Sequence, residues 1–140
     1  MSSASPALSS CVLFTDAGTK GSARIGGAIF RAQGRKRHLV EVRRFSRAAQ
    51  KTQSIDHMEY EALIEGMRLA KQLGVQWLWA FVDRRPIVQQ FYQCPRKPAE
   101  SSRKNLQTVV ELSWGFTSFG MSWLPRDLNV ADAIARSAIQ

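Results

Sequence analysis

The sequence has little of several features, and each shortage excludes a class of protein. No apolar run approaches the roughly 20 residues that a membrane-spanning helix needs, so we expect no membrane partner. The two cysteines, Cys11 and Cys94, fit neither the spacing of a zinc site nor that of a disulfide framework. A reduced, cytoplasmic setting is therefore expected. The N-terminal MSSASPALSS lacks the basic and apolar regions of a signal peptide, and residues 1–9 are predicted to be a flexible tail.

Acidic residues are scarce relative to basic ones. Twenty Lys and Arg stand against eleven Asp and Glu, which gives a formal net charge of +9 and a pI near 10.4. The basic residues cluster in 31–38, 43–47, 83–86 and 95–104. This balance is typical of proteins that bind nucleic acids or other polyanions. Solvated loops and protected strand edges are the ordinary alternative explanation.

The remaining sequence is typical of one globular domain, predicted over residues 10–140, since 44% of the residues are hydrophobic. Short runs over 11–16, 24–32 and 38–46 predict an antiparallel meander of three strands. The later elements are predicted as a helix over 57–73 closed by Gly74, an apolar strand over 75–83 buried on both faces, a short helix from Pro86, a helix over 103–113, a strand over 116–125 and a helix over 129–139. This order predicts an α/β fold, a five-stranded mixed sheet with helices on both faces.

Four acidic residues occupy positions where a charge is unusual. Asp16 and Asp83 each end an apolar strand, and Asp132 lies in the first turn of the last helix. Glu59 falls within the apolar stripe of the long helix at ~100° per residue. Each has an ordinary explanation. Asp16 suits a turn, and Glu59 suits a capping box with Asp56 as the cap. Asp83 suits an N-cap, and Asp132 suits the helix dipole.

Taken together, the four acids predict a metal site. Polar groups at strand ends in a mixed sheet can converge on one end of that sheet, where ligand sites form. Crowded carboxylates repel one another unless a cation compensates them. Oxygen-only ligands suit Mg²⁺ or Mn²⁺. Two such ions about 4 Å apart can promote the in-line displacement of a phosphoryl group.

Five segments resemble the type 1 ribonuclease H family from Cys11 to Ile139: FTDAG, GGAIF, HMEYEALIEGMRLAKQLG, WAFVD and WLPRDLNVADAIA. The resemblance implies an RNase H-like fold and an endonuclease that cuts the RNA strand of RNA–DNA hybrids, leaving 5′-phosphate and 3′-hydroxyl ends. It also implies two Mg²⁺ or Mn²⁺ ions held by Asp16, Glu59, Asp83 and Asp132. In the family pattern Asp16 bridges both ions and Asp132 completes the site of the ion that activates water. Glu59 and Asp83 then lie beside the leaving 3′-oxygen.

The residues that the resemblance implies for contact with nucleic acid are Gly18, Ser22, Asp56, Arg84, Arg126, Asn129, Arg96 and Lys97. Some of them depart from the family pattern. Ser22 and Asp56 stand where asparagines are usual, and Arg84 stands where serine is common. The loop before the last helix lacks the family's histidine, for which Arg126 is the nearest stand-in. The basic protrusion of some members is replaced by the short loop over 94–104.

Alternatives remain open. The same fold could serve as a non-catalytic nucleic-acid-binding module, or as a nuclease for double-stranded RNA or structured DNA. The acids could also be caps and turns in an unrelated basic α/β protein. A monomer or a weak dimer is expected. The four tryptophans could stack on bases, but we expect them in the core.

Overall fold

The computed structural model describes residues 10–18, 23–33, 38–49, 54–92 and 100–125. The elements in these residues are β1 (Ser10–Gly18), β2 (Arg24–Gln33), β3 (His38–Ala48), α1 (Ile55–Gln72), β4 (Trp77–Val82), α2 (Arg85–Tyr92), α3 (Glu100–Ser113) and β5 (Ser118–Trp123). The predicted order is confirmed as far as β5. The predicted tail over 1–9 and the predicted helix over 129–139 lie outside the described residues.

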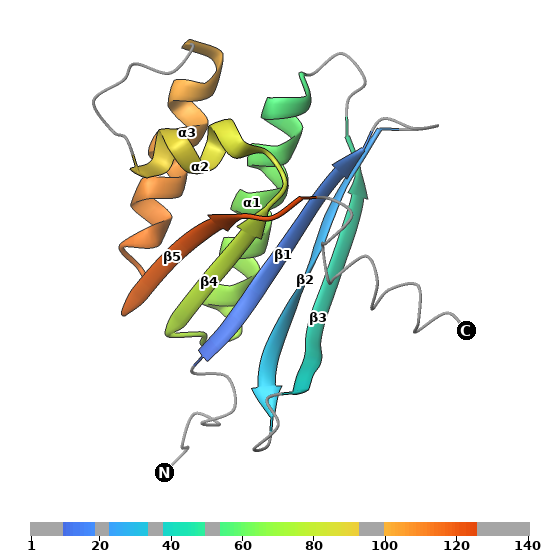
Figure 1. Cartoon of the computed structure of the whole chain (residues 1–140), viewed down its shortest axis with the longest axis vertical. Coiled ribbons are helices and arrows are strands. Elements are labelled where there is room, and N and C mark those ends of the chain that lie inside the picture. Colours follow the sequence, from blue (N-terminus) through green and yellow to red (C-terminus); the bar gives the residue numbers. More distant parts are fainter. Residues whose placement is uncertain (1–9, 19–22, 34–37, 50–53, 93–99, 126–140) are drawn as a thin grey trace.

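The five strands of the described chain form one mixed sheet in the order β3-β2-β1-β4-β5 (Figure 1). β1, β2 and β3 pair antiparallel, as the short turns predict. β4 pairs parallel with both β1 and β5. The register of β1 and β4 places Phe14 opposite Phe81, and this pair is the last of the ladder. The C-terminal half of β1 and the end of β4 therefore lie next to each other at one end of the sheet.

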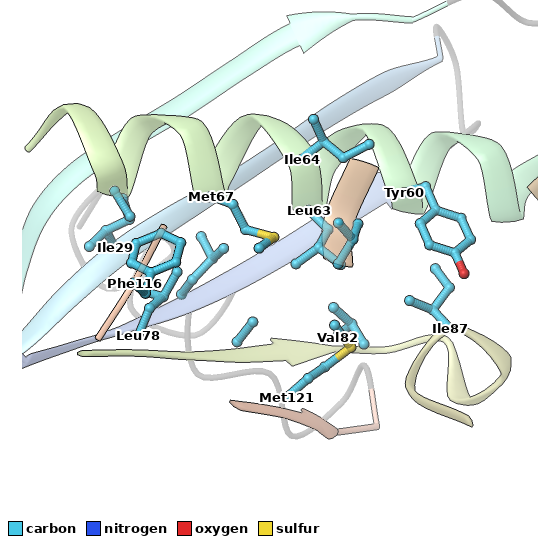
Figure 2. Packing of buried hydrophobic residues seen from close by; sticks show 14 of the residues in the cluster. Ile29, Tyr60, Leu63, Ile64, Met67, Leu78, Val82, Ile87, Phe116 and Met121 are labelled. Carbon is cyan, nitrogen blue, oxygen red and sulfur yellow. The ribbon is translucent and has the colours of Figure 1, made fainter. Parts of the chain in front are cut away.

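The main core lies between the sheet and the helices. Leu63 and Met67 of α1 belong to one buried cluster with Leu78 and Val82 of β4 and with Met121 of β5, and Figure 2 shows these side chains along the interface between α1 and the strands. Ile87 of α2 and Val109 of α3 belong to the same cluster. Burial of large apolar side chains is the main stabilising term for such a layer.

Both ends of helix α1 carry residues that favour a helix terminus. Ser54 is the N-cap, and its side-chain oxygen accepts a hydrogen bond from the backbone N–H of His57 at 3.1 Å. Gly74 has φ +81°, which glycine adopts without steric cost. The N–H of Val75 then donates to the carbonyl of Ala70 at 3.0 Å, as in a Schellman motif. The predicted end at Gly74 is confirmed.

A second apolar cluster lies on the sheet around Phe14, Ala28 and Phe30, with Phe81 stacked on Phe14 at 5.1 Å between ring centroids. The three described helices all cover the other face (Figure 1). Helices on both faces therefore stay a prediction, because residues 129–139 lie outside the described chain. None of the described helices is long and apolar enough to cross a bilayer.

The expectation that β4 is buried on both faces is wrong, and so is the assignment of the tryptophans to the core. Trp77 and Trp79 are 48% and 44% exposed, while Leu78 and Ala80 between them are buried. Trp114 and Trp123 are also exposed. The ring of Trp79 covers the backbone of Gly120, where an added Cβ would lie 2.1 Å from it. The glycine leaves room for a ring that lies on the sheet surface.

Candidate active site

Two aspartates meet where β1 and β4 separate. The parallel ladder ends at Phe14 and Phe81, and Asp16 and Asp83 each follow two residues later. β1 itself continues to Gly18 because β2 still pairs with it, with Gly26 opposite Asp16. The prediction that strand one ends at Asp16 is therefore wrong. Asp16 lies inside β1, at a position where β1 still pairs with β2 but no longer with β4.

Glu59 reaches the same place from α1. The helix packs on β1 and β2, and it can approach closely because Gly66 faces Leu13, where an added Cβ would lie 2.6 Å from a Leu13 methyl carbon. Glu59 lies one turn into the helix, is 1% exposed and shares its burial with Met58 and Tyr60. The prediction from the helical wheel, an acid within the apolar stripe, is confirmed.

The three carboxylates converge. Each of Asp16, Glu59 and Asp83 offers one oxygen, and these oxygens all lie within 4.8 Å of one another. Within the described residues, Oε2 of Glu59 and Oδ1 of Asp83 are buried without a hydrogen-bond partner. We call these three residues the acidic triad. Asp132, the predicted fourth member, lies outside the described residues.

The electrostatics of the triad favour a cation. The pKa of Glu59 is raised to about 9, first by burial, then by the neighbouring Asp83 carboxylate and by Asp16, while the Arg84 guanidinium opposes the shift. A buried carboxylate with like charges around it keeps its proton unless a positive charge replaces that proton. Carboxylate oxygens are the ligands that Mg²⁺ and Mn²⁺ prefer, and two of those in the triad have no hydrogen-bond partner among the described residues. The triad therefore fits a divalent metal ion.

Arg84 and Asp56 form an ion pair at the edge of the triad. Nε and Nη2 of Arg84 both donate to Oδ1 of Asp56, at 2.8 and 2.5 Å. The pair joins the connection between β4 and α2 to the first turn of α1. Asp56 is not the helix cap, because Ser54 occupies that position. The capping-box explanation of Glu59 is therefore wrong.

Asp83 does not cap the next helix. α2 begins at Arg85, and the N–H of Ile87 donates to the carbonyl of Arg84. Asp83 thus precedes the cap position by one residue, and its carboxylate belongs to the triad.

Of the predicted nucleic-acid contacts, Gly18 lies two residues beyond Asp16 at the end of β1. Five of the predicted contacts lie outside the described residues: Ser22, Arg96, Lys97, Arg126 and Asn129.

Two further residues beside the triad were not predicted as site residues. Cζ of Arg85 lies 4.1 Å from the centroid of the Trp123 ring. Nε1 of Trp123 donates to the backbone carbonyl of Asp83 at 3.3 Å. The basic run at 83–86 is a sequence signal for Arg85, but the composition of β5 gives no sign that Trp123 reaches it.

A family model described as "Reverse transcriptase-like" matches residues 14–138 of the chain. The chain belongs to the reverse transcriptase-like family. Comparison of the sequence with curated proteins found no match. The matched residues include Asp16, Glu59 and Asp83.

Solved structures share the fold of this reverse transcriptase-like chain. RNase H1 from the halophilic archaeon Halobacterium salinarum superposes with a TM-score of 0.75 at 21% identity, over 92% of this chain and 96% of that one. The N-terminal RNase H domain of a Mycobacterium tuberculosis protein gives 0.75 at 22% identity, over 92% and 98%. LC11-RNase H1, solved with an RNA/DNA hybrid, gives 0.70 at 19% identity, over 93% and 99%. The RNase H-like fold is thereby shown.

Proposed function

We propose that this protein is a metal-dependent ribonuclease H, which hydrolyses the RNA strand of RNA–DNA hybrids. The observation that carries the proposal is the acidic triad, which brings three carboxylate oxygens within 4.8 Å in a chain with an RNase H-like fold. The matched structure of LC11-RNase H1 contains an RNA/DNA hybrid, which supports the choice of substrate. The net charge of +9 suits a polyanion.

The residues divide the work between holding metal and holding nucleic acid. Asp16, Glu59 and Asp83 would hold the metal, and Asp132 is proposed as the fourth ligand. Two bound Mg²⁺ or Mn²⁺ ions would supply Lewis acidity and water activation for the hydrolysis. The phosphorus–O3′ bond breaks, so the products carry a 5′-phosphate and a 3′-hydroxyl. Burial of Glu59 keeps bulk water from one side of the triad.

Three of the candidate contacts with nucleic acid, Gly18, Asp56 and Arg84, lie in the described residues near the triad. Gly18 ends β1 two residues beyond Asp16, where the chain presents backbone rather than a side chain. Asp56 and Arg84 lie on the α1 side of the triad, where they can meet ribose hydroxyls and phosphates. Ser22, Arg96, Lys97, Arg126 and Asn129 complete the proposed contacts on the resemblance to ribonuclease H alone.

The test is cleavage of an end-labelled RNA–DNA hybrid with Mg²⁺ or Mn²⁺, beside single-stranded RNA, duplex RNA and duplex DNA of the same sequence. We expect cleavage of the RNA in the hybrid, no cleavage with a chelator, and at least a 100-fold loss of rate in Asp16→Asn, because removal of one preorganised group at a reacting centre typically costs about 100- to 1000-fold. Glu111→Gln, on the exposed side of α3, is the matched control that keeps the rate.

Two other results would change the assignment. Cleavage of duplex RNA in preference to the hybrid would assign a different substrate to the same acidic triad. Tight binding of the hybrid with no cleavage in either metal would identify a binding module. The ion pair of Asp56 with Arg84, which replaces uncharged residues of the family pattern, is the feature to examine in that case.

A further inference from the structure

Arg85 and Trp123 form an exposed pair beside the acidic triad. The 4.1 Å between Cζ of Arg85 and the Trp123 ring centroid is a cation–π contact. The indole N–H of Trp123 donates to the carbonyl of Asp83. This hydrogen bond connects the pair directly to Asp83 of the triad.

The fold explains why the pair forms there. The parallel register of β4 and β5 places Trp123 opposite Val82, the last residue of β4. The N–H of Leu124 donates to the carbonyl of Val82 at 2.9 Å, which fixes the two strand ends together. α2 starts at Arg85, two residues after Asp83. The end of β5 and the start of α2 thus meet at the triad.

The consecutive residues Arg84 and Arg85 point to different elements. Arg84 pairs with Asp56 of α1, whereas Arg85 stacks on Trp123 of β5. In the sheet, β5 lies beyond β4 on the side away from β1, and α1 packs on β1 and β2. One guanidinium is therefore held toward α1 and the other toward β5.

In the part of the chain that the structure describes, only one of the two guanidinium groups, that of Arg84, is paired with a carboxylate. The charge of Arg84 is matched by Asp56. Among the described residues, no carboxylate forms an ion pair with Arg85, whose contact is an uncharged ring. Stacking leaves the N–H groups around the edge of the guanidinium plane free to donate, and their fork geometry matches a phosphate.

We propose that Arg85 and Trp123 act as one phosphate-positioning unit. Arg85 binds a phosphate of the nucleic-acid strand that lies in the triad, at a nucleotide next to the one being cut. Trp123 is a positioning residue, which holds the guanidinium by stacking and ties it to the Asp83 backbone. This inference rests on the proposed function, since it needs a nucleic-acid strand across the triad.

The test measures binding of an RNA–DNA hybrid to the full chain in EDTA, where no cleavage occurs, over a series of salt concentrations. Arg85→Gln is expected to weaken binding about three- to tenfold and to reduce the slope of log K against log salt by about one, as expected for one lost phosphate contact. Arg85→Lys keeps the charge and is expected to keep the slope. Arg68→Gln, on the exposed face of α1, removes the same charge elsewhere and is the matched control.

Trp123 is tested through its dependence on Arg85. Trp123→Leu is expected to weaken binding about threefold in the wild-type chain and to have no effect in the Arg85→Gln chain, because coupled residues are not additive. Trp123→Phe keeps an aromatic face and is expected to bind nearly as the wild type does. Trp77→Leu, an exposed tryptophan in the first position of β4, is the matched control. Thermal unfolding of each variant checks that it is folded.

The outcomes separate this inference from the proposed function. Equal affinities and equal salt slopes for Arg85→Gln and Arg68→Gln would overturn the role of Arg85. Equal effects of Trp123→Leu with and without Arg85 would overturn the coupling. A wild-type chain that does not bind the hybrid at all would instead contradict the proposed function, and this inference with it.

Discussion

Glu59 combines two properties that rarely coexist, a carboxylic acid and nearly complete burial. Its pKa is raised to about 9, mainly by burial and then by Asp83 and Asp16. Between about pH 4.5 and 9 the metal-free folded protein therefore binds a proton that the unfolded chain has lost. Because the folded state binds more protons, the free energy of unfolding falls as pH rises through this window.

Glu59→Gln is expected to remove this dependence, because glutamine has a similar shape and does not titrate. At pH 7 in EDTA the variant is expected to be about 3 kcal/mol more stable than the wild type, since pH 7 lies about 2.5 units above the pKa of Glu59 in the unfolded chain. The difference should shrink toward zero at pH 4 and grow toward pH 9. Urea unfolding at several pH values measures it, with Glu111→Gln as the control.

A wild-type chain and a Glu59→Gln chain with parallel stability curves from pH 4 to pH 9 would contradict this expectation. That result would mean that the carboxyl group of Glu59 has the same pKa in the folded and unfolded states. The close approach of the triad oxygens would then have to be compensated in another way in the metal-free protein.

Asp56 presents a negative charge where phosphates are proposed to lie. Asp56→Asn is expected to strengthen binding of the RNA–DNA hybrid about threefold at low salt, since it removes a repulsive charge and releases Arg84 for phosphate. Its effect on the free energy of unfolding should stay below about 1 kcal/mol, because both partners are about one-third exposed. Binding isotherms in EDTA and urea unfolding give the two quantities.

Weaker binding by Asp56→Asn would contradict this expectation. It would show that the carboxylate itself accepts a hydrogen bond from the substrate, as its position in the family pattern implies. Glu41→Gln, which breaks the exposed ion pair with Arg44 on β3, is the matched control for loss of one surface acid.

At the scale of elements, periodicity predicted the helices and strands because their patterns are strong. The apolar stripe of α1 and the glycine after it give its position within about two residues. β4 shows where this reasoning fails. Its sequence WLWAFV is apolar at every position, so nothing in it tells that the face with Trp77 and Trp79 is exposed.

The candidate site was predictable in part for a related reason. Asp16, Glu59 and Asp83 each carry a local signal, since the two aspartates follow apolar runs and Glu59 lies within the apolar stripe of a helix. The extension of β1 past Asp16 depends on pairing with residues of β2 that lie farther along the chain, such as Gly26 opposite Asp16. The contact of Trp123 with Asp83 depends on the register of β5 with β4. Such pairings over long sequence distances leave no local pattern.

The contact of α1 with β1 at Gly66 gives a prediction for the element as a whole. Gly66→Ala would place a Cβ 2.6 and 2.7 Å from the two methyl carbons of Leu13, which is fully buried. Overpacking of this kind is expected to lower the free energy of unfolding by about 1–3 kcal/mol, although alanine alone would favour the helix by about 1 kcal/mol. Urea unfolding measures the net effect.

The double variant Gly66→Ala with Leu13→Val tests the cause. The smaller side chain makes room for the new methyl group, so the double variant should be more stable than the sum of the two single changes implies. A stability of Gly66→Ala at or above that of the wild type would show that α1 can shift without cost. The distance from Glu59 to the aspartates would then not depend on this contact.

At the scale of the whole molecule, two surface properties compete to explain how a long nucleic acid is held. The chain carries a net charge of +9, and exposed arginines lie along β3, where Arg43, Arg44 and Arg47 are accessible. It also exposes Trp77, Trp79 and Trp114, of which Trp114 is 75% exposed. Charge attracts the phosphates of any duplex, whereas aromatic rings favour unpaired bases.

If charge dominates, log K for the hybrid in EDTA should fall with log salt with a slope steeper than about −3, which corresponds to roughly four phosphate contacts. A DNA duplex of equal length should give nearly the same slope, so the ratio of the two affinities stays constant as salt rises. Fluorescence anisotropy with labelled duplexes measures both. A slope near zero, with loss of affinity in Trp79→Leu or Trp114→Leu, would show instead that the exposed rings hold the nucleic acid. Selectivity for the hybrid would then have to come from contacts with the bases, because the phosphates of the two duplexes would contribute little.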